Sequence, residues 1–176
     1  MPGYVAKASD HGSVRELSEL DAMCLRHAQE FIRVENVELA LMALDAIEDQ
    51  NHRDALIVRC AVLKRQRNWK ALEQAAVCLM QEAQDTAEGA LFFSEAMHGT
   101  QDTEQALDFL TSYALRFAMD AHVAYHLARF SCALGEHDTA ASYLRRAFST
   151  GAGASLKEEA ANEPDFRPIA AQIPTL

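Results

Sequence analysis

The sequence predicts an all-α protein built from pairs of antiparallel helices, and three observations carry this prediction. The 176 residues contain four prolines, none of them between residues 3 and 163, so a long central region is free to be helical. Ala, Leu, Glu and Gln, which favour helices, dominate that region. Small residues also recur in apolar segments at intervals close to the length of two short helices.

The recurring small residues are alanines that mark the second helix of each pair. Ala40, Ala71, Ala106 and Ala140 are separated by 31, 35 and 34 residues. Two helices approach closely only where a short side chain leaves room, so these positions predict the seams of four hairpins. The expected first helices cover residues 21–33, 53–66, 87–98 and 120–134, and the expected second helices cover residues 37–49, 69–84, 103–117 and 138–149.

Capping and turn residues set the expected helix ends. Asp102 and Asp138 are predicted N-caps, because their side-chain oxygens can accept free backbone N–H groups. Ser13 to Glu16 matches a capping box, which predicts a helix start near residue 14. Gly135 permits the tight turn of the last hairpin. Trp69 is expected to open its helix and to pack between hairpins.

The segment 154–173 is predicted to cap the C-terminal end of the array, because an end hairpin would otherwise expose apolar surface. Pro164 suits the first position of a short helix. Phe166 and Ile169 are then expected to cover the last hairpin. Residues 1–12 are expected to be disordered, which leaves residues 13–176 as a single helical domain.

The packing pattern of the last hairpin resembles the tetratricopeptide repeat. The matching residues are Leu127, Ala128, Gly135, Ala140, Leu144 and Ala147. The resemblance covers residues 20–170, and the segment Glu163–Phe166 is similar to the end of a bacterial group of such proteins with no established enzymatic activity. It implies a right-handed superhelix of about four antiparallel helix pairs plus a C-terminal capping helix. The register around Trp69 stays open, because Trp69 lies one place closer to Ala71 than the family pattern has it, and three or four repeats fit.

The resemblance also implies a binding groove on the concave face, lined by the first helix of each pair. Carried over by register, the outward positions include Cys60, Glu88 and Glu95, and the predicted partner-binding residues among them are Gln29, Arg33, Arg53, Leu56, Lys64, Leu91, His98, His122, Tyr125 and Arg129. The cations of this set are expected to meet carboxylates of a peptide, and its leucines and tyrosine to supply apolar anchors. The alternative is that these charges simply solvate a helix face.

Charge and cysteine usage limit the partners and the compartment. The net charge of −10 disfavours nucleic acid and anionic membranes, which need an excess of Lys and Arg. No apolar run approaches a membrane span, and the first residues lack the hydrophobic region of a secretory signal. The four cysteines are scattered without a CxxC, as in a reduced cytoplasmic protein. The prediction is a cytoplasmic protein whose partner is a protein or peptide.

No motif predicts an enzyme, and no cofactor or metal is expected. The sequence lacks the two glycine-rich phosphate-binding patterns GxxxxGK[ST] and GxGxxG. His122 and His126 lie four residues apart and can face one metal ion, but no third ligand accompanies them. Cys24 and His27 share a helix face without the third member that nucleophilic catalysis requires.

The predicted function is a non-catalytic scaffold that binds a peptide or protein in its concave groove. The alternatives are a cargo chaperone of a secretion system, which is similarly small and acidic, and a metal-dependent enzyme using His122 and His126. RNA binding is disfavoured by the net charge. A receptor for chaperone tails is not expected, because the Lys and Asn that grip such tails in one subgroup are replaced here by Leu25, Gln29, Cys60, Glu88 and Phe92.

Overall fold

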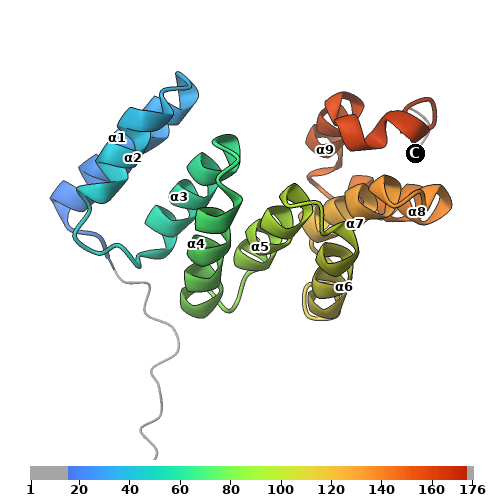
Figure 1. Cartoon of the computed structure of the whole chain (residues 1–176), viewed down its shortest axis with the longest axis horizontal. Coiled ribbons are helices and arrows are strands. Elements are labelled where there is room, and N and C mark those ends of the chain that lie inside the picture. The colour runs from blue at the N-terminus through green and yellow to red at the C-terminus, as the bar shows by residue number, and fades with distance from the viewer. Residues whose placement is uncertain (1–15, 174–176) are drawn as a thin grey trace, which may run out of the picture.

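The computed structural model describes residues 16–173, and these form nine α-helices and one short 3-10 helix. The predicted disordered segment 1–12 and the domain boundary at residue 13 lie outside the described residues. The elements, labelled in Figure 1, are α1 (Glu19–Arg33), α2 (Val37–Asp45), α3 (Arg53–Arg65), α4 (Trp69–Glu82), α5 (Glu88–Gly99), α6 (Thr103–Ala114), α7 (Ala121–Ala133), α8 (His137–Phe148), α9 (Gly153–Asn162) and the 3-10 helix η1 (Pro164–Ile169).

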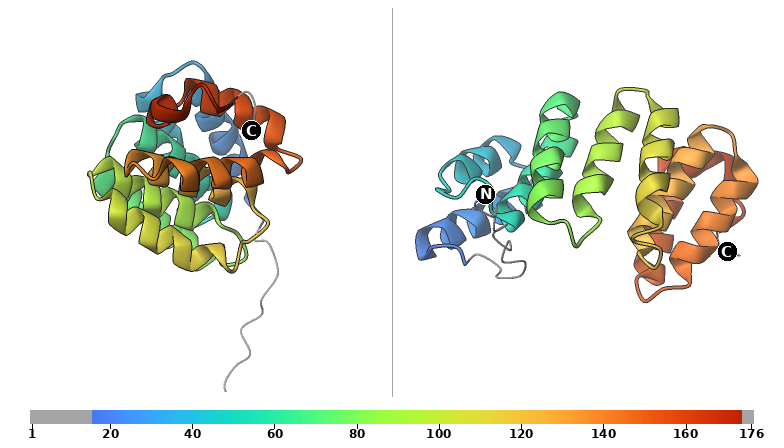
Figure 2. Two further views of the ribbon diagram at one scale, coloured as in Figure 1. Left: turned by 90° about the vertical axis from the view of Figure 1, so that its right-hand side faces the viewer. Right: turned by 90° about the horizontal axis from the view of Figure 1, so that it is seen from below.

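The helices pair into four antiparallel hairpins that follow one another in a row, so the predicted fold class is confirmed (Figures 1 and 2). Each second helix packs on its own first helix, and α2, α4 and α6 also pack on the first helix of the next hairpin. The first helices α1, α3, α5 and α7 contact one another in sequence. They therefore share one face of the array, which is called the first-helix face below.

The turns inside the four hairpins have the same geometry. Each contains one residue with positive φ, followed by a residue whose N–H bonds to the carbonyl five positions earlier, which is the Schellman ending of a helix. The positive-φ residues are Glu35 (57°), Arg67 (54°), Gln101 (70°) and Gly135 (83°). The spacing of these turns fixes the repeat register independently of the side chains that pack between helices.

The left-handed backbone predicts opposite effects for two substitutions. Gly135→Ala will lower the free energy of unfolding by about 1 kcal/mol, because an L-residue with a Cβ is strained at this φ. Gln101→Gly will raise it by about 0.5 kcal/mol, because the same strain is removed at some entropic cost. Urea unfolding followed by circular dichroism measures both, and equal signs for the two variants would contradict the argument.

The turn register corrects one of the expected seam residues. Counted from the positive-φ residue of each turn, Ala40, Ala106 and Ala140 are equivalent to Leu72, not to Ala71. Leu72 is completely buried, as are the three alanines, whereas Ala71 is partly exposed. Leu72 lies in one buried cluster with Cys60 of α3, which is also completely buried.

Two of the expected helix starts are wrong, and a third is right in position but lacks the expected capping bond. Residues 16–18 are not helical, and α1 begins at Glu19 with Ser18 accepting from the N–H of Asp21. Asp102 occupies the N-cap of α6 without a side-chain capping bond, and Asp138 lies inside α8. Capping carboxamides and carboxylates are instead found at α2, α4 and α7, from Asn36, Asn68 and Asp120.

The C-terminal cap is as predicted. η1 begins with Pro164 at its first position and packs across α7, and α9 packs on α8. Phe166 and Ile169 are 0% and 1% exposed within the core of the last hairpin. The predicted place of Trp69 is also confirmed: it opens α4, and a Cβ on Gly99 of α5 would lie 2.4 Å from its ring.

Candidate functional site

The first-helix face carries a buried carboxylate, Glu95 of α5, in place of an apolar side chain. Glu95 is 2% exposed. Two nitrogens of Arg129 on α7 donate to its two oxygens, Nη1 to Oε1 and Nη2 to Oε2 at 3.2 Å. A bidentate guanidinium–carboxylate pair is the geometry in which a buried charge is best satisfied. The pair joins the third hairpin to the fourth.

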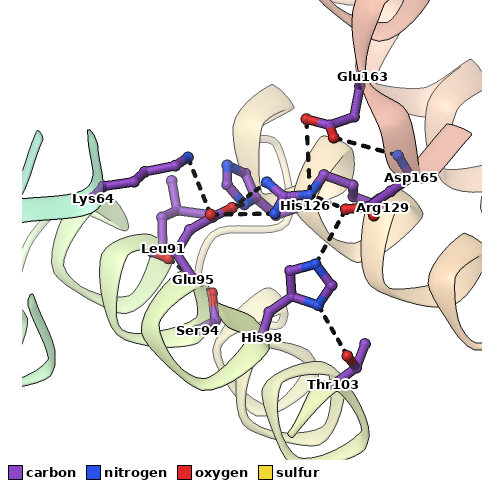
Figure 3. A network of polar contacts seen from close by, with 10 residues as sticks. All are labelled: Lys64, Leu91, Ser94, Glu95, His98, Thr103, His126, Arg129, Glu163 and Asp165. Atoms are coloured by element: carbon purple, nitrogen blue, oxygen red, sulfur yellow. Dashed lines mark hydrogen bonds and ion pairs between the residues drawn. The ribbon is translucent and has the colours of Figure 1, made fainter. Parts of the chain in front are cut away.

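Two further nitrogens approach Glu95 from neighbouring helices (Figure 3). Nδ1 of His126 on α7 lies 2.7 Å from Oε1, and Nζ of Lys64 on α3 lies 3.1 Å from Oε2. Lys64 reaches in from solvent, with its side chain 40% exposed. Glu95 is therefore the centre of a network that joins α3, α5 and α7.

The C-terminal segment completes the network from the other side of Arg129. Nε of Arg129 donates to Oδ2 of Asp165 on η1 at 2.8 Å, and Glu163 lies 3.9 Å from the same nitrogen. Nε2 of His98 lies 3.1 Å from Oδ2 of Asp165 and Nδ1 lies 2.9 Å from Oγ1 of Thr103. Since a carboxylate only accepts, Nε2 of His98 donates to Asp165. Asp165, near the start of η1, is thus held between Arg129 of α7 and His98 of α5.

The ion pairs of this face alternate in sign along the array. Arg53 of α3 also pairs with Glu88 of α5 at 2.9 Å, near the opposite end of the two helices. Arg53 and Lys64 of α3 therefore pair with carboxylates of α5. Glu95 of α5 also pairs with Arg129 of α7, and Arg129 pairs in turn with Asp165 of η1. This alternating set is called the charge row; its members are Arg53, Lys64, Glu88, Glu95, His126, Arg129 and Asp165.

Burial and neighbouring charges shift the pKa values within the charge row. Burial alone would raise the pKa of Glu95, but His126, Arg129 and Lys64 outweigh it and hold that pKa well below its usual value. Burial lowers the pKa of His126, against the opposing effect of Glu95. The hydrogen bond from His98, together with Arg129, lowers the pKa of Asp165.

These shifts predict that acid destabilises the protein. All three pKa values are lower in the fold than in the unfolded chain, so the unfolded state binds more protons as the pH falls. The stability that depends on neutral His126 will be lost below about pH 6.5, and that of the ionised carboxylates below about pH 4.5. Urea unfolding between pH 7 and pH 4 measures this loss of unfolding free energy. In His126→Gln the part of the loss that occurs above pH 5 will be smaller. The exposed His122→Gln is the matched control, and equal pH profiles for the two variants would contradict the assignment.

The predicted groove residues fall into three groups. Gln29, Arg33 and His122 are exposed, and Leu91 is half-buried. Four residues lie on the first-helix face but pair with side chains of the same chain: Arg53, Lys64, His98 and Arg129. Leu56 and Tyr125, at 3% and 1% exposure, are core residues and not the exposed apolar anchors expected. In the corrected register Ile57 takes the place assigned to Leu56, and η1 covers Tyr125, whose ring meets that of Phe166 edge to edge at 5.4 Å.

The register placed Glu95 at an outward groove position, but not as a buried carboxylate bound by the chain's own cations. His126 and Asp165 were not among the predicted groove positions. The repeat contains a signal for Glu95, since Glu95 lies 34 residues before Arg129 and so takes the equivalent position in the preceding first helix. No comparable signal exists for Asp165, whose place depends on how η1 folds back over α7.

The described residues contain no group of three or more His, Cys, Asp or Glu side chains suited to a metal ion. His122 is exposed and His126 contacts Glu95, so the two histidines belong to different environments. Burial raises the pKa of the Cys60 thiol to about 12, which suits a core residue. Between residues 16 and 173, no helix has the length and apolar character that crossing a membrane requires.

An array of helix hairpins with a continuous face of first helices is the architecture of a helical-repeat solenoid. Among solved structures, the chain is similar to one described as "MamA RS-1 ArsTM double mutant", with a TM-score of 0.60 and 14% sequence identity over 81% of this chain and 78% of that one. No family model and no curated protein matches the sequence. The likeness supports the tetratricopeptide-like fold.

Proposed function

We propose that the chain is a non-catalytic scaffold that holds a protein partner on the part of the first-helix face formed by α1, α3 and α5. Stacked hairpins present a preformed surface, and this lowers the ordering cost of binding. The similarity to the MamA structure supports the architecture on which this proposal rests.

The observation that carries the proposal is the difference between the two ends of the first-helix face. At α7 the face is covered by η1. Asp165 of η1 pairs with Arg129, and Phe166 packs on Tyr125. On α1 and α3 the equivalent surface has no such cover among the described residues. Gln29 and Arg33 are exposed there, and Ala61 stands where α5 has Glu95 and α7 has Arg129.

The residues in the open part of the face favour an acidic partner segment. Arg33 makes no ion pair with another described residue, and the side chains of Arg53 and Lys64 remain 38% and 40% exposed despite their pairs. In a chain with a net charge of −10, these are the positive charges that the open part of the face offers to a partner. Such cations attract carboxylates and speed encounter with an acidic segment.

Site-specific photocrosslinking in the native cell tests the proposal. A photoreactive amino acid at Gln29, on the first-helix face, will capture a discrete protein that mass spectrometry identifies. The same amino acid at Gln74, exposed on the second helix α4, is the matched control and will not capture that protein. Capture of the same proteins from both positions, or from neither, would overturn the assignment of this face.

A further inference from the structure

The first hairpin, at the left end of the array in Figure 1, is joined to the second by a connection unlike the later ones. Helix α2 has 9 residues, against 14 in α4 and 12 in α6. It ends at Asp45, and residues 46–52 follow without regular helix before α3 begins. Helix α2 therefore contacts α3 less extensively than α4 contacts α5 or α6 contacts α7.

Small side chains of α3 make its apolar contact with the first hairpin. The core of that hairpin includes Ala55, Val58 and Val62 of α3. The second and third hairpins instead meet where Trp69 and Met80 of α4 lie directly against glycines of α5. A large side chain contributes more to packing than alanine or valine, because it removes more apolar surface from water. The first hairpin is therefore held less strongly than the third by apolar contacts with the second.

Polar contacts of the first hairpin with α3 lie at the surface of the protein. Arg59 of α3 donates to Oε1 of Gln50 at 2.7 Å and pairs at 2.8 Å with Asp45, whose side chain is 68% exposed. Arg65 donates to the carbonyl oxygen of Ile32 at 2.7 Å. Exposed contacts of this kind hold two elements weakly, because water screens the charges. The charge row, which links α3, α5, α7 and η1, has no member in the first hairpin.

The connection between α2 and α3 divides into a part bound to the first hairpin and a part bound to α3. Asp21 of α1 accepts the N–H of Glu48 at 2.8 Å, and the side-chain amide of Gln50 donates to carbonyl oxygens at the end of α2. His52 is the N-cap of α3. Asn51 lies between these two parts and is exposed. A change of backbone torsion at Asn51 therefore turns the first hairpin against α3 while each part keeps its own helix.

We propose that the first hairpin moves as a unit about the turn at Asn51, so that α1 approaches or leaves α3. This inference rests on the proposed function, because α1 carries Gln29 and Arg33 of the partner-binding face. The motion changes the distance between these side chains and Lys64 of α3, and with it the width of the open part of the first-helix face. Hinge motions of this kind need only a few backbone torsions to change. The face adjusts at its α1 end, while α3, α5 and α7 stay joined by the charge row.

Distances between paired spin labels, measured by electron paramagnetic resonance on the full chain, test the proposal. Met42, Gln74 and Asp108 are exposed and take equivalent positions on α2, α4 and α6, counted from the positive-φ residues of the turns. Labels carried by unnatural amino acids at Met42 and Gln74 span the hinge, and labels at Gln74 and Asp108 form the matched control pair. The distance distribution across the hinge will be about twice as broad as that of the control pair. Equally narrow distributions would overturn the proposal.

Arg59→Ala removes the contacts with Gln50 and Asp45, so the distribution across the hinge will broaden further while the control pair stays unchanged. Arg145→Ala, at an exposed arginine of α8, is the control substitution and will change neither distribution. No broadening in Arg59→Ala contradicts the proposal, and a loss of its helical circular dichroism shows that α2 unfolds and does not move as a unit. The labelled chain is measured alone, so a rigid first hairpin leaves the face assigned by photocrosslinking standing, and a failed crosslink at Gln29 leaves the hinge standing.

Discussion

Glu95→Ala will lower the free energy of unfolding by about 3–5 kcal/mol, the cost of leaving a buried cation without its partner. Arg129 is 8% exposed and loses both of its bonds to Glu95, while His126 and Lys64 lose the carboxylate they face. Three helices are held by this one side chain, so the loss will be felt in the second, third and fourth hairpins together. Urea unfolding at pH 7, followed by circular dichroism, measures it.

The matched control is Arg53→Ala, which removes the other pair between α3 and α5. Both partners of that pair are more than a third exposed, at 38% and 40%. Water screens such pairs, so the expected loss is only about 0.2–1 kcal/mol. Replacing Glu95 and Arg129 together by Leu and Met will restore most of the stability, because no buried charge is left unpaired. A double variant as unstable as Glu95→Ala would show that the cost comes from lost packing instead.

Phe166→Ala will lower the free energy of unfolding by a similar amount, about 3–5 kcal/mol, by leaving a cavity under the C-terminal cap. Phe166 is completely buried and its ring meets that of Tyr125, which is also buried. Without Phe166, η1 loses its main apolar contact with α7, and Asp165 is no longer held beside Arg129. The fourth hairpin is thus expected to unfold before the rest.

Hydrogen exchange measured by mass spectrometry tests this order. Amides of α7 and α8 will exchange faster in Phe166→Ala, whereas those of α1 and α2 will not change. Leu115→Ala is the control, since Leu115 is 89% exposed and a surface substitution of this kind changes stability by about 0.5 kcal/mol or less. Uniform acceleration across all four hairpins would mean that the array unfolds as one unit.

The fold was largely predictable because its determinants are local. The hairpins were predicted from helix periodicity, recurrent small residues and the absence of proline from residues 3–163. The cap was predicted from Pro164 and Phe166. The error at Ala71 arose from treating alanine as the required seam residue. The structure has a completely buried leucine, Leu72, at the equivalent position, in one cluster with Cys60.

The site was less predictable because its determinants are distant in sequence. The sequence indicated that Arg129 and Lys64 lie on the first-helix face, and they do. It did not indicate that their partners come from the same chain, because those contacts depend on how neighbouring hairpins stack and how η1 returns over α7. Tyr125 illustrates the same limit: its register is that of a groove residue, but Phe166 buries it.

The alternating signs of the charge row have a consequence for the order of the units. The four turns have one geometry, so by backbone alone any unit of about 34 residues could follow any other. The side chains do not permit such an exchange. If the second and fourth units changed places, cations would still lie beside Glu95, but Arg129 would be separated from Glu163 and Asp165. The sequence of hairpins is thus specified electrostatically, and a permuted array would misassemble although every unit in it could still form its own hairpin.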